Sequence, residues 1–176
     1  MSLSDFLDSV GNKLKEKIEN FKAISIFVRE RSKFEGWLKI EVVDTLLDLG
    51  IPKERITPEE NRTDIVFELE GKKVGMELKT INTNYIHELV KNKTRPITKN
   101  IEGILDDINK LKRNTEFHER VIVFVVFPLS EKNEKFWRKH IEKIKKHCKK
   151  LKEWEINFKM DFEEKVPGWL YIGELY

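Results

Sequence analysis

The sequence has little of what several common kinds of protein chemistry require. Its one cysteine, Cys148, excludes an internal disulfide and a cysteine-ligated zinc or iron–sulfur site within one chain. No apolar run reaches membrane-spanning length and no signal peptide is visible, so we expect a cytoplasmic protein with no membrane partner. The sequence also contains no P-loop, no glycine-rich nucleotide-binding fingerprint and no nucleophilic serine or cysteine triad.

Charge of both signs is abundant. Charged residues make up 37% of the 176 residues, yet the net charge is only +3 and the pI is about 8.8. This mild basic bias is compatible with a polyanionic partner but does not identify one. The length suits one domain with a sizeable core. We therefore expect an N-terminal helical extension at residues 1–22 and a single α/β domain at residues 23–176.

The most informative stretch is residues 61–80, which alternates between apolar and polar side chains along two arms. Strict alternation with one apolar side predicts two half-buried strands. Between them, residues 70–71 can form a two-residue turn, with Gly71 where a positive φ is needed. If these two residues are the whole loop, Asp64 lies directly opposite Glu77.

This register places two carboxylates side by side on the hairpin. Directly opposed residues have Cβ atoms roughly 5 Å apart, and Lys79 lies on the same face, one pleat beyond Glu77. Two carboxylates at that distance repel each other unless something neutralises them. Mg²⁺ binds one or two carboxylates together with waters and substrate phosphate, so Asp64 and Glu77 are candidate metal ligands. The alternative is a surface hairpin whose charged side chains are simply solvated.

Asp64, followed on the next strand by Glu77-Leu78-Lys79, resembles the core motif of the PD-(D/E)XK nuclease superfamily, which has the restriction-endonuclease-like fold. The resemblance implies that Asp64, Glu77 and the Leu78 carbonyl ligate Mg²⁺ (or Mn²⁺). It also implies that Lys79 positions the attacking water, helps to deprotonate it and stabilises developing negative charge. Thr63 stands where the name-giving proline of the family often lies.

The order of the expected elements extends the resemblance beyond the motif. Residues 34–128 predict the succession α-β-β-β-α-β with a mixed central sheet, which resembles the restriction-endonuclease-like core. An N-terminal helix precedes this α/β core, and a C-terminal helix and strands follow it. Residues 23–28 fit either a strand or a helix. The expected elements are helices at 4–21, 34–50, 99–112 and 131–152, and strands at 54–57, 64–69, 73–79, 120–128, 154–162 and 169–175.

The helix at residues 34–50 contains two glutamates, Glu35 and Glu41. Many relatives of the fold place a glutamate on the first core helix, where it reaches the metal. Glu41 fits that placement better than Glu35, so the resemblance implies that Glu41 ligates the metal directly or through water. A solvated surface glutamate is the competing interpretation.

The segment at residues 81–96 follows the second hairpin strand and is long for a structureless connection, which is typical of a functional loop. Basic side chains in and just after it are candidates for contact with a phosphate backbone. A solvated loop explains any one of them equally well. The candidates are Lys91, Lys93, Arg95 and Lys99.

Together these observations predict a metal-dependent nuclease that hydrolyses phosphodiester bonds of DNA, with RNA as the second choice. Because a DNA nuclease must handle two strands, a homodimer is an attractive expectation. Two alternatives stay open. One is a non-catalytic nucleic-acid-binding module on the same fold. The other is a protein-interaction subunit that assembles through the N-terminal helix or the apolar face of the helix at residues 131–152.

Overall fold

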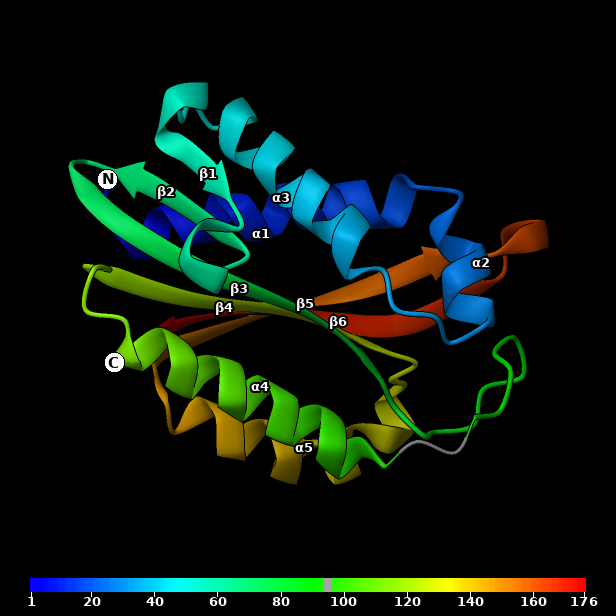
Figure 1. Cartoon of the computed structure of the whole chain (residues 1–176). Coiled ribbons are helices and arrows are strands. Elements are labelled where there is room, and N and C mark those ends of the chain that lie inside the picture. Colours follow the sequence, from blue (N-terminus) through cyan, green and yellow to red (C-terminus); the bar gives the residue numbers. More distant parts are fainter. Residues whose placement is uncertain (94–95) are drawn as a thin grey trace.

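The computed structural model describes residues 1–93 and 96–176, and it contains an open six-stranded sheet with helices on both faces (Figure 1). The expected α/β class and mixed central sheet are confirmed. The helices are α1 (Leu3–Asn20), α2 (Ile24–Arg29), α3 (Glu35–Asp48), α4 (Ile97–Arg113) and α5 (Glu131–Lys145). The strands are β1 (Ile56–Pro58), β2 (Ile65–Leu69), β3 (Lys72–Asn82), β4 (Glu119–Phe127), β5 (Cys148–Lys159) and β6 (Lys165–Leu175).

The strand order is β1-β2-β3-β4-β6-β5, with only β3 and β4 parallel. Parallel strands need a long crossover, and α4 provides it. In the β2–β3 hairpin, Leu69 pairs with Lys72 and Ile65 pairs with Met76. The predicted register is therefore confirmed. Both residues of the turn, 70–71, have positive φ, as a two-residue hairpin turn of this kind requires.

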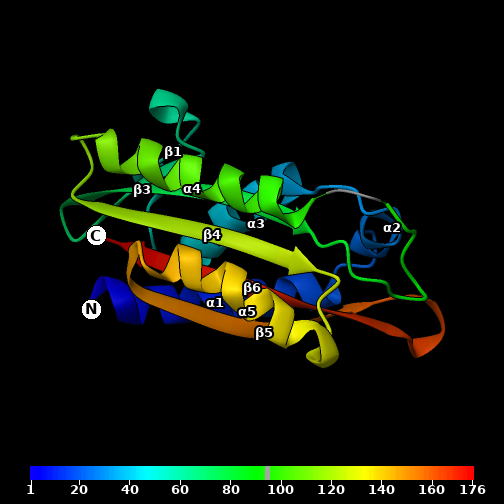
Figure 2. The same ribbon diagram turned by 90° about the horizontal axis from the view of Figure 1, so that it is seen from below.

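Helices α1 and α3 cover one face of the sheet, and α4 and α5 cover the other (Figures 1 and 2). Strand β4 lies between these layers and is buried on both faces, which explains its nearly continuous apolar sequence. Val121, Val123 and Val125 belong to the core cluster on the α1 and α3 side. Ile122 and Phe124 belong to the cluster on the α4 and α5 side.

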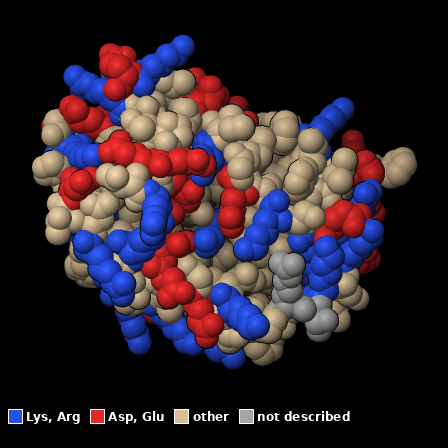
Figure 3. All heavy atoms as spheres, viewed as in Figure 1, with Lys and Arg blue, Asp and Glu red and all other residues tan. Residues whose placement is uncertain are grey.

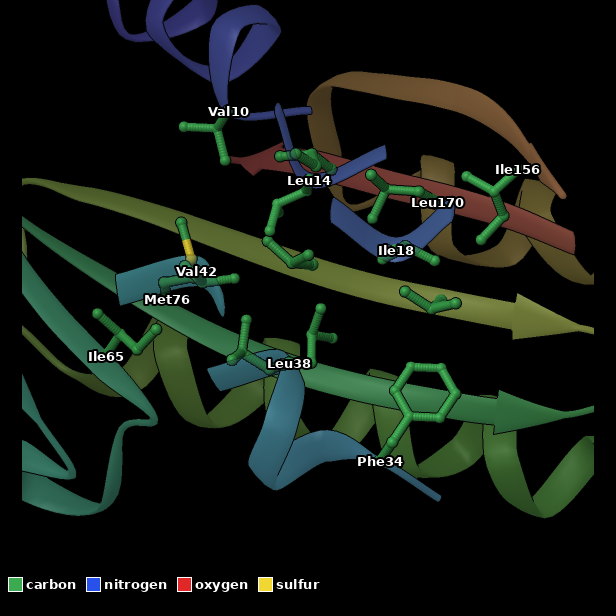
Figure 4. Packing of buried hydrophobic residues seen from close by; sticks show 14 of the residues in the cluster. Val10, Leu14, Ile18, Phe34, Leu38, Val42, Ile65, Met76, Ile156 and Leu170 are labelled. Carbon is green, nitrogen blue, oxygen red and sulfur yellow. The ribbon is translucent and has the colours of Figure 1, made fainter. Parts of the chain in front are cut away.

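Helix α1 is part of the main core. Its apolar stripe packs with side chains from α3 and from strands β2, β3, β5 and β6 (Figure 4). Residues 1–22, which the sequence analysis separates as an extension, thus supply several of the best-buried side chains. The buried residues of the stripe are Phe6, Leu7, Val10, Leu14 and Ile18.

The C-terminal part differs from the expectation. The helix expected at residues 131–152 ends at Lys145, and β5 already begins at Cys148. A β-bulge between Cys148 and Lys150 shifts the strand by one residue. Cys148 and Leu151 therefore both contact the core cluster on the α4 and α5 side. Their spacing continues the apolar pattern of the helix. The expected strand at residues 154–162 ends earlier, at Lys159.

Smaller differences lie at element ends. Residues 23–28, which fitted a strand or a helix, lie largely in α2. The strand expected at residues 54–57 begins at Ile56, after a short 3₁₀ turn. No helix within residues 1–93 and 96–176 is both long and apolar enough to cross a membrane.

Candidate active site

The site lies at an open edge of β3. Beyond Met76 this edge has no paired residue of β2, and two backbone N–H groups there donate to carboxylates instead. The N–H of Leu78 donates to Oδ2 of Asp64 at 2.9 Å, and the N–H of Thr80 donates to Oε1 of Glu35 at 3.1 Å. Asp64 precedes β2, and Glu35 lies in the first turn of α3. Two acidic side chains from distant segments thus lie along one strand edge.

Glu77 and Lys79 project from β3 toward α4. Oε1 of Glu77 is 2.5 Å from Nζ of Lys110, and Nζ of Lys79 is 2.9 Å from Oδ2 of Asp107. A Cβ added to Gly103 would lie 3.9 Å from Cε of Lys79. Gly103, Asp107 and Lys110 are spaced by four and three positions, so they share one face of α4. This face covers the carboxylate and the lysine of the hairpin.

The pKa values of Asp64 and Glu77 are shifted in opposite directions. Burial raises the pKa of Glu77, nearby Asp64 raises it further, and Lys110 only partly compensates, so the value is about 7. Burial also opposes ionisation of Asp64. Its hydrogen bonds to Lys39 and to the Leu78 N–H outweigh burial, however, and lower its pKa. Two carboxylates that share a site behave in this way. Near neutral pH, Asp64 is ionised and Glu77 is partly protonated.

Lys79 is held as an ammonium ion. Burial disfavours its charge, but the hydrogen bond to Asp107 and the charges of Asp107, Glu35 and Asp64 outweigh burial and raise its pKa. Lys79 can therefore donate hydrogen bonds and stabilise negative charge. With a raised pKa it is poorly suited to accept a proton, which favours the positioning and charge-stabilising parts of its expected role over deprotonation of water.

Helix α3 brings Glu35 to the site, whereas the sequence analysis preferred Glu41. Nζ of Lys39 lies 2.9 Å from Oδ1 of Asp64, and Glu35, four residues earlier, lies on the same helix face. Glu41 is two positions beyond Lys39, which is about 200° around a helix. Its Oε2 instead lies 3.8 Å from Nζ of Lys17 on α1. The structure does not bring Glu41 to Asp64 and Glu77.

Among the described residues, the lysines predicted to contact a phosphate backbone form no ion pair with Asp64 or Glu77. Nζ of Lys91 is 2.7 Å from Oε2 of Glu30, while Lys93 and Lys99 are exposed. Arg95 lies outside the described residues. The side chain of Arg31 is buried and donates to the backbone carbonyls of Thr83, Tyr85 and Lys91. Arg31 thereby fixes the start of the loop, and no local sequence signal marks this role.

The donor atoms near Asp64 and Glu77 are of the kind that binds a divalent cation. Because the N–H and C=O of one strand residue point to the same side, the Leu78 carbonyl also faces the open edge. Two carboxylates and a carbonyl are oxygen donors that suit Mg²⁺ or Mn²⁺ ions that keep several waters. Burial and nearby Asp64 raise the pKa of Glu77, and a bound cation would favour its ionised form. Among the described residues, no group of three or more His, Cys, Asp or Glu side chains is arranged to hold a metal ion.

The surroundings of the site are strongly charged. On the face shown in Figure 3, acidic and basic side chains meet between α3 and α4. Lys39 comes from the helix on one side of the sheet and Lys110 from the helix on the other. Each lysine contacts one of the two carboxylates. No protein-family model, curated protein or solved structure matches the chain.

Proposed function

We propose that the chain is a Mg²⁺- or Mn²⁺-dependent nuclease of the PD-(D/E)XK type that hydrolyses phosphodiester bonds of DNA. The observation that carries the proposal is the hairpin register, which sets Asp64 beside Glu77 and leaves Lys79 on the same face. The element order α3-β1-β2-β3-α4-β4, with β3 parallel to β4, supports a restriction-endonuclease-like core.

The residues of the site have separate tasks in this proposal. Asp64, Glu77 and the Leu78 carbonyl hold the cation, and Glu77 must lose its proton to do so. A bound cation supplies polarisation of the phosphate and a lowered pKa for the attacking water. Lys79, oriented by its 2.9 Å contact with Asp107, donates to the water and stabilises the negative charge that develops on the phosphate.

Cleavage of supercoiled plasmid and of single-stranded DNA with Mg²⁺ or Mn²⁺ tests the proposal. We expect Asp64→Ala and Lys79→Ala to lower the rate by roughly 10²-fold or more, as loss of one transition-state contact does elsewhere. Lys149→Ala is the matched control, because this lysine also pairs with glutamates but lies at the start of β5. The proposal is wrong if folded wild-type protein does not cut, or if all variants cut equally.

A non-catalytic nucleic-acid-binding module is the second candidate, and one observation favours it. Lys39, Lys110 and Asp107 already form ion pairs with Asp64, Glu77 and Lys79 respectively. Such a network can be stable without a metal ion. Titration calorimetry with Mn²⁺ separates the two candidates. The nuclease requires binding that Asp64→Ala abolishes, whereas the module requires salt-dependent DNA binding with no Mn²⁺ binding at this site.

A further inference from the structure

We propose that Lys110 binds a phosphate of the nucleic-acid substrate, and that Glu77 holds this lysine only until a divalent cation occupies the carboxylate pair. The inference rests on the proposed function and assigns to α4 a substrate contact that the hairpin motif does not include. It starts from the 2.5 Å contact between Nζ of Lys110 and Oε1 of Glu77.

Lys110 is the least restrained of the lysines at the site. Its side chain is 42% exposed, compared with 22% for Lys39 and 28% for Lys79. Lys39 contacts Glu59 as well as Asp64, so it keeps a partner when Asp64 is engaged elsewhere. Within the described part of the chain, the only ion pair of Lys110 is with Glu77.

The charges favour a change of partner for Lys110 when a cation binds. A cation ligated by Asp64 and Glu77 cancels the negative charge that attracts Lys110, and two cations at such short range repel each other. The four-carbon stem of a lysine lets its ammonium group move to another acceptor. A phosphodiester brought to the same cation places a new anion within reach of Lys110, and lysine contacts supply much of the affinity for nucleic-acid phosphates.

Two acceptors on α4 compete for the released lysine. Asp107, three residues earlier, is already 2.9 Å from Lys79. Asp106, four residues earlier, is exposed and could form a helical i,i+4 pair with Lys110. Such pairs contribute little in water. If Lys110 moved to Asp106 alone, it would not affect DNA binding, and the experiment below detects that result.

The test measures duplex DNA binding by fluorescence anisotropy in Ca²⁺ and in EDTA, with the DNA checked for integrity on a gel. Lys110→Met is compared with wild type and with Lys149→Met, a control whose lysine is 44% exposed and also paired with glutamates. We expect Ca²⁺ to strengthen wild-type binding about tenfold. Lys110→Met should lose most of this gain. It should also reduce the slope of log affinity against log salt concentration by about one. Lys149→Met should keep the gain, and Lys110→Arg should restore it.

Calorimetry with Ca²⁺ distinguishes failure of this inference from failure of the proposed function. If wild-type protein binds no Ca²⁺, the metal site and the proposed nuclease both fail. If wild type and Lys110→Met bind Ca²⁺ equally but their DNA affinities respond equally to it, the metal site stands and the role of Lys110 is wrong. Loss of Ca²⁺ binding in Lys110→Met would also overturn the inference, because Lys110 would then act on the carboxylates themselves.

Discussion

At the scale of single residues, the protonation of Glu77 links the site to stability. The pKa of Glu77 rises from an ordinary 4.5 to about 7 in the folded protein. The folded state therefore binds a proton between about pH 4.5 and 7 that the unfolded state has released. Stability from this group is fully present below about pH 4.5 and is lost as the pH rises through about 7. A difference of this size corresponds to roughly 3 kcal/mol.

We therefore expect Glu77→Gln to increase the free energy of unfolding at pH 8 and to have little effect at pH 4.5, because glutamine resembles the protonated acid. Urea denaturation in EDTA across this pH range measures the difference. Glu16→Gln, an exposed position on α1, is the control and should show no such trend. An effect of Glu77→Gln that does not change with pH would contradict the prediction.

Glu35 allows a second prediction about a single residue. Its carboxylate accepts the Thr80 N–H at the open strand edge. Glu35→Ala leaves that partly buried donor without an acceptor, so we expect a loss of about 1–3 kcal/mol. Glu35→Gln keeps an oxygen acceptor and should cost much less. Denaturant unfolding at neutral pH measures both. Glu41→Ala is the control, since it removes only a 3.8 Å ion pair with Lys17, and an equal loss there would contradict the assignment.

The residues of the candidate site differ in how far the sequence could identify them. Asp64, Glu77 and Lys79 could be grouped because a two-residue turn fixes the register of a hairpin locally. Lys39 and Lys110 could not, because each comes from a helix whose rotation over the sheet depends on packing. The same reason explains the choice of Glu41, since helical spacing does not tell which turn of α3 faces the strand edge.

At the scale of elements, α1 protects the long edge strand β5. Oε1 of Glu19 accepts the N–H of Asn157 at 2.9 Å, and Nζ of Lys15 donates to the carbonyl of Glu155 at 2.6 Å. Unpaired groups on an edge strand can pair with another chain. The two α1 side chains occupy such groups, so helix and strand stabilise each other beyond their apolar contact.

We expect the double substitution Lys15→Ala and Glu19→Ala to increase self-association, because it frees backbone groups of β5 for pairing. It should also lower the free energy of unfolding by about 1–2 kcal/mol. Light scattering during incubation measures the first effect, and urea denaturation measures the second. Glu16→Ala, on the same helix, should match wild type in both assays. Unchanged scattering by the double variant would show that α1 does not protect this edge.

Strand β5 also shows where sequence patterns fail at this scale. Regular alternation identified the β2–β3 hairpin, and a nearly continuous apolar run identified β4. The bulge between Cys148 and Lys150 breaks the two-residue period at the start of β5. Apolar residues 144, 148 and 151 then follow a helical spacing across the junction. Pairing with β6, which joins Cys148 to Leu175, makes this segment a strand. A local sequence pattern does not contain that information.

At the scale of the whole molecule, helices from the two faces of the sheet both contribute side chains to the open edge of β3. Helix α3 packs on one face and α4 on the other, and each sends a lysine to the carboxylate pair. The short β2 leaves the end of β3 open, so both helices reach the same point. The composition and element order could predict an α/β domain, but the convergence of the two layers depends on the complete tertiary structure.

Deletion of residues 1–22 tests whether the N-terminal helix is an extension or part of the domain. The fully buried side chains of α1 lie in the main core cluster. Burial of each large apolar side chain contributes about 1.5–3 kcal/mol, so their sum approaches the 5–15 kcal/mol stability of a typical domain. We therefore expect the truncated chain to lose its near-ultraviolet circular dichroism and its cooperative urea transition. Val10→Ala in the full chain, as a milder variant, should shift the transition midpoint without abolishing it. A cooperative transition in the truncated chain would show that residues 23–176 form a domain by themselves.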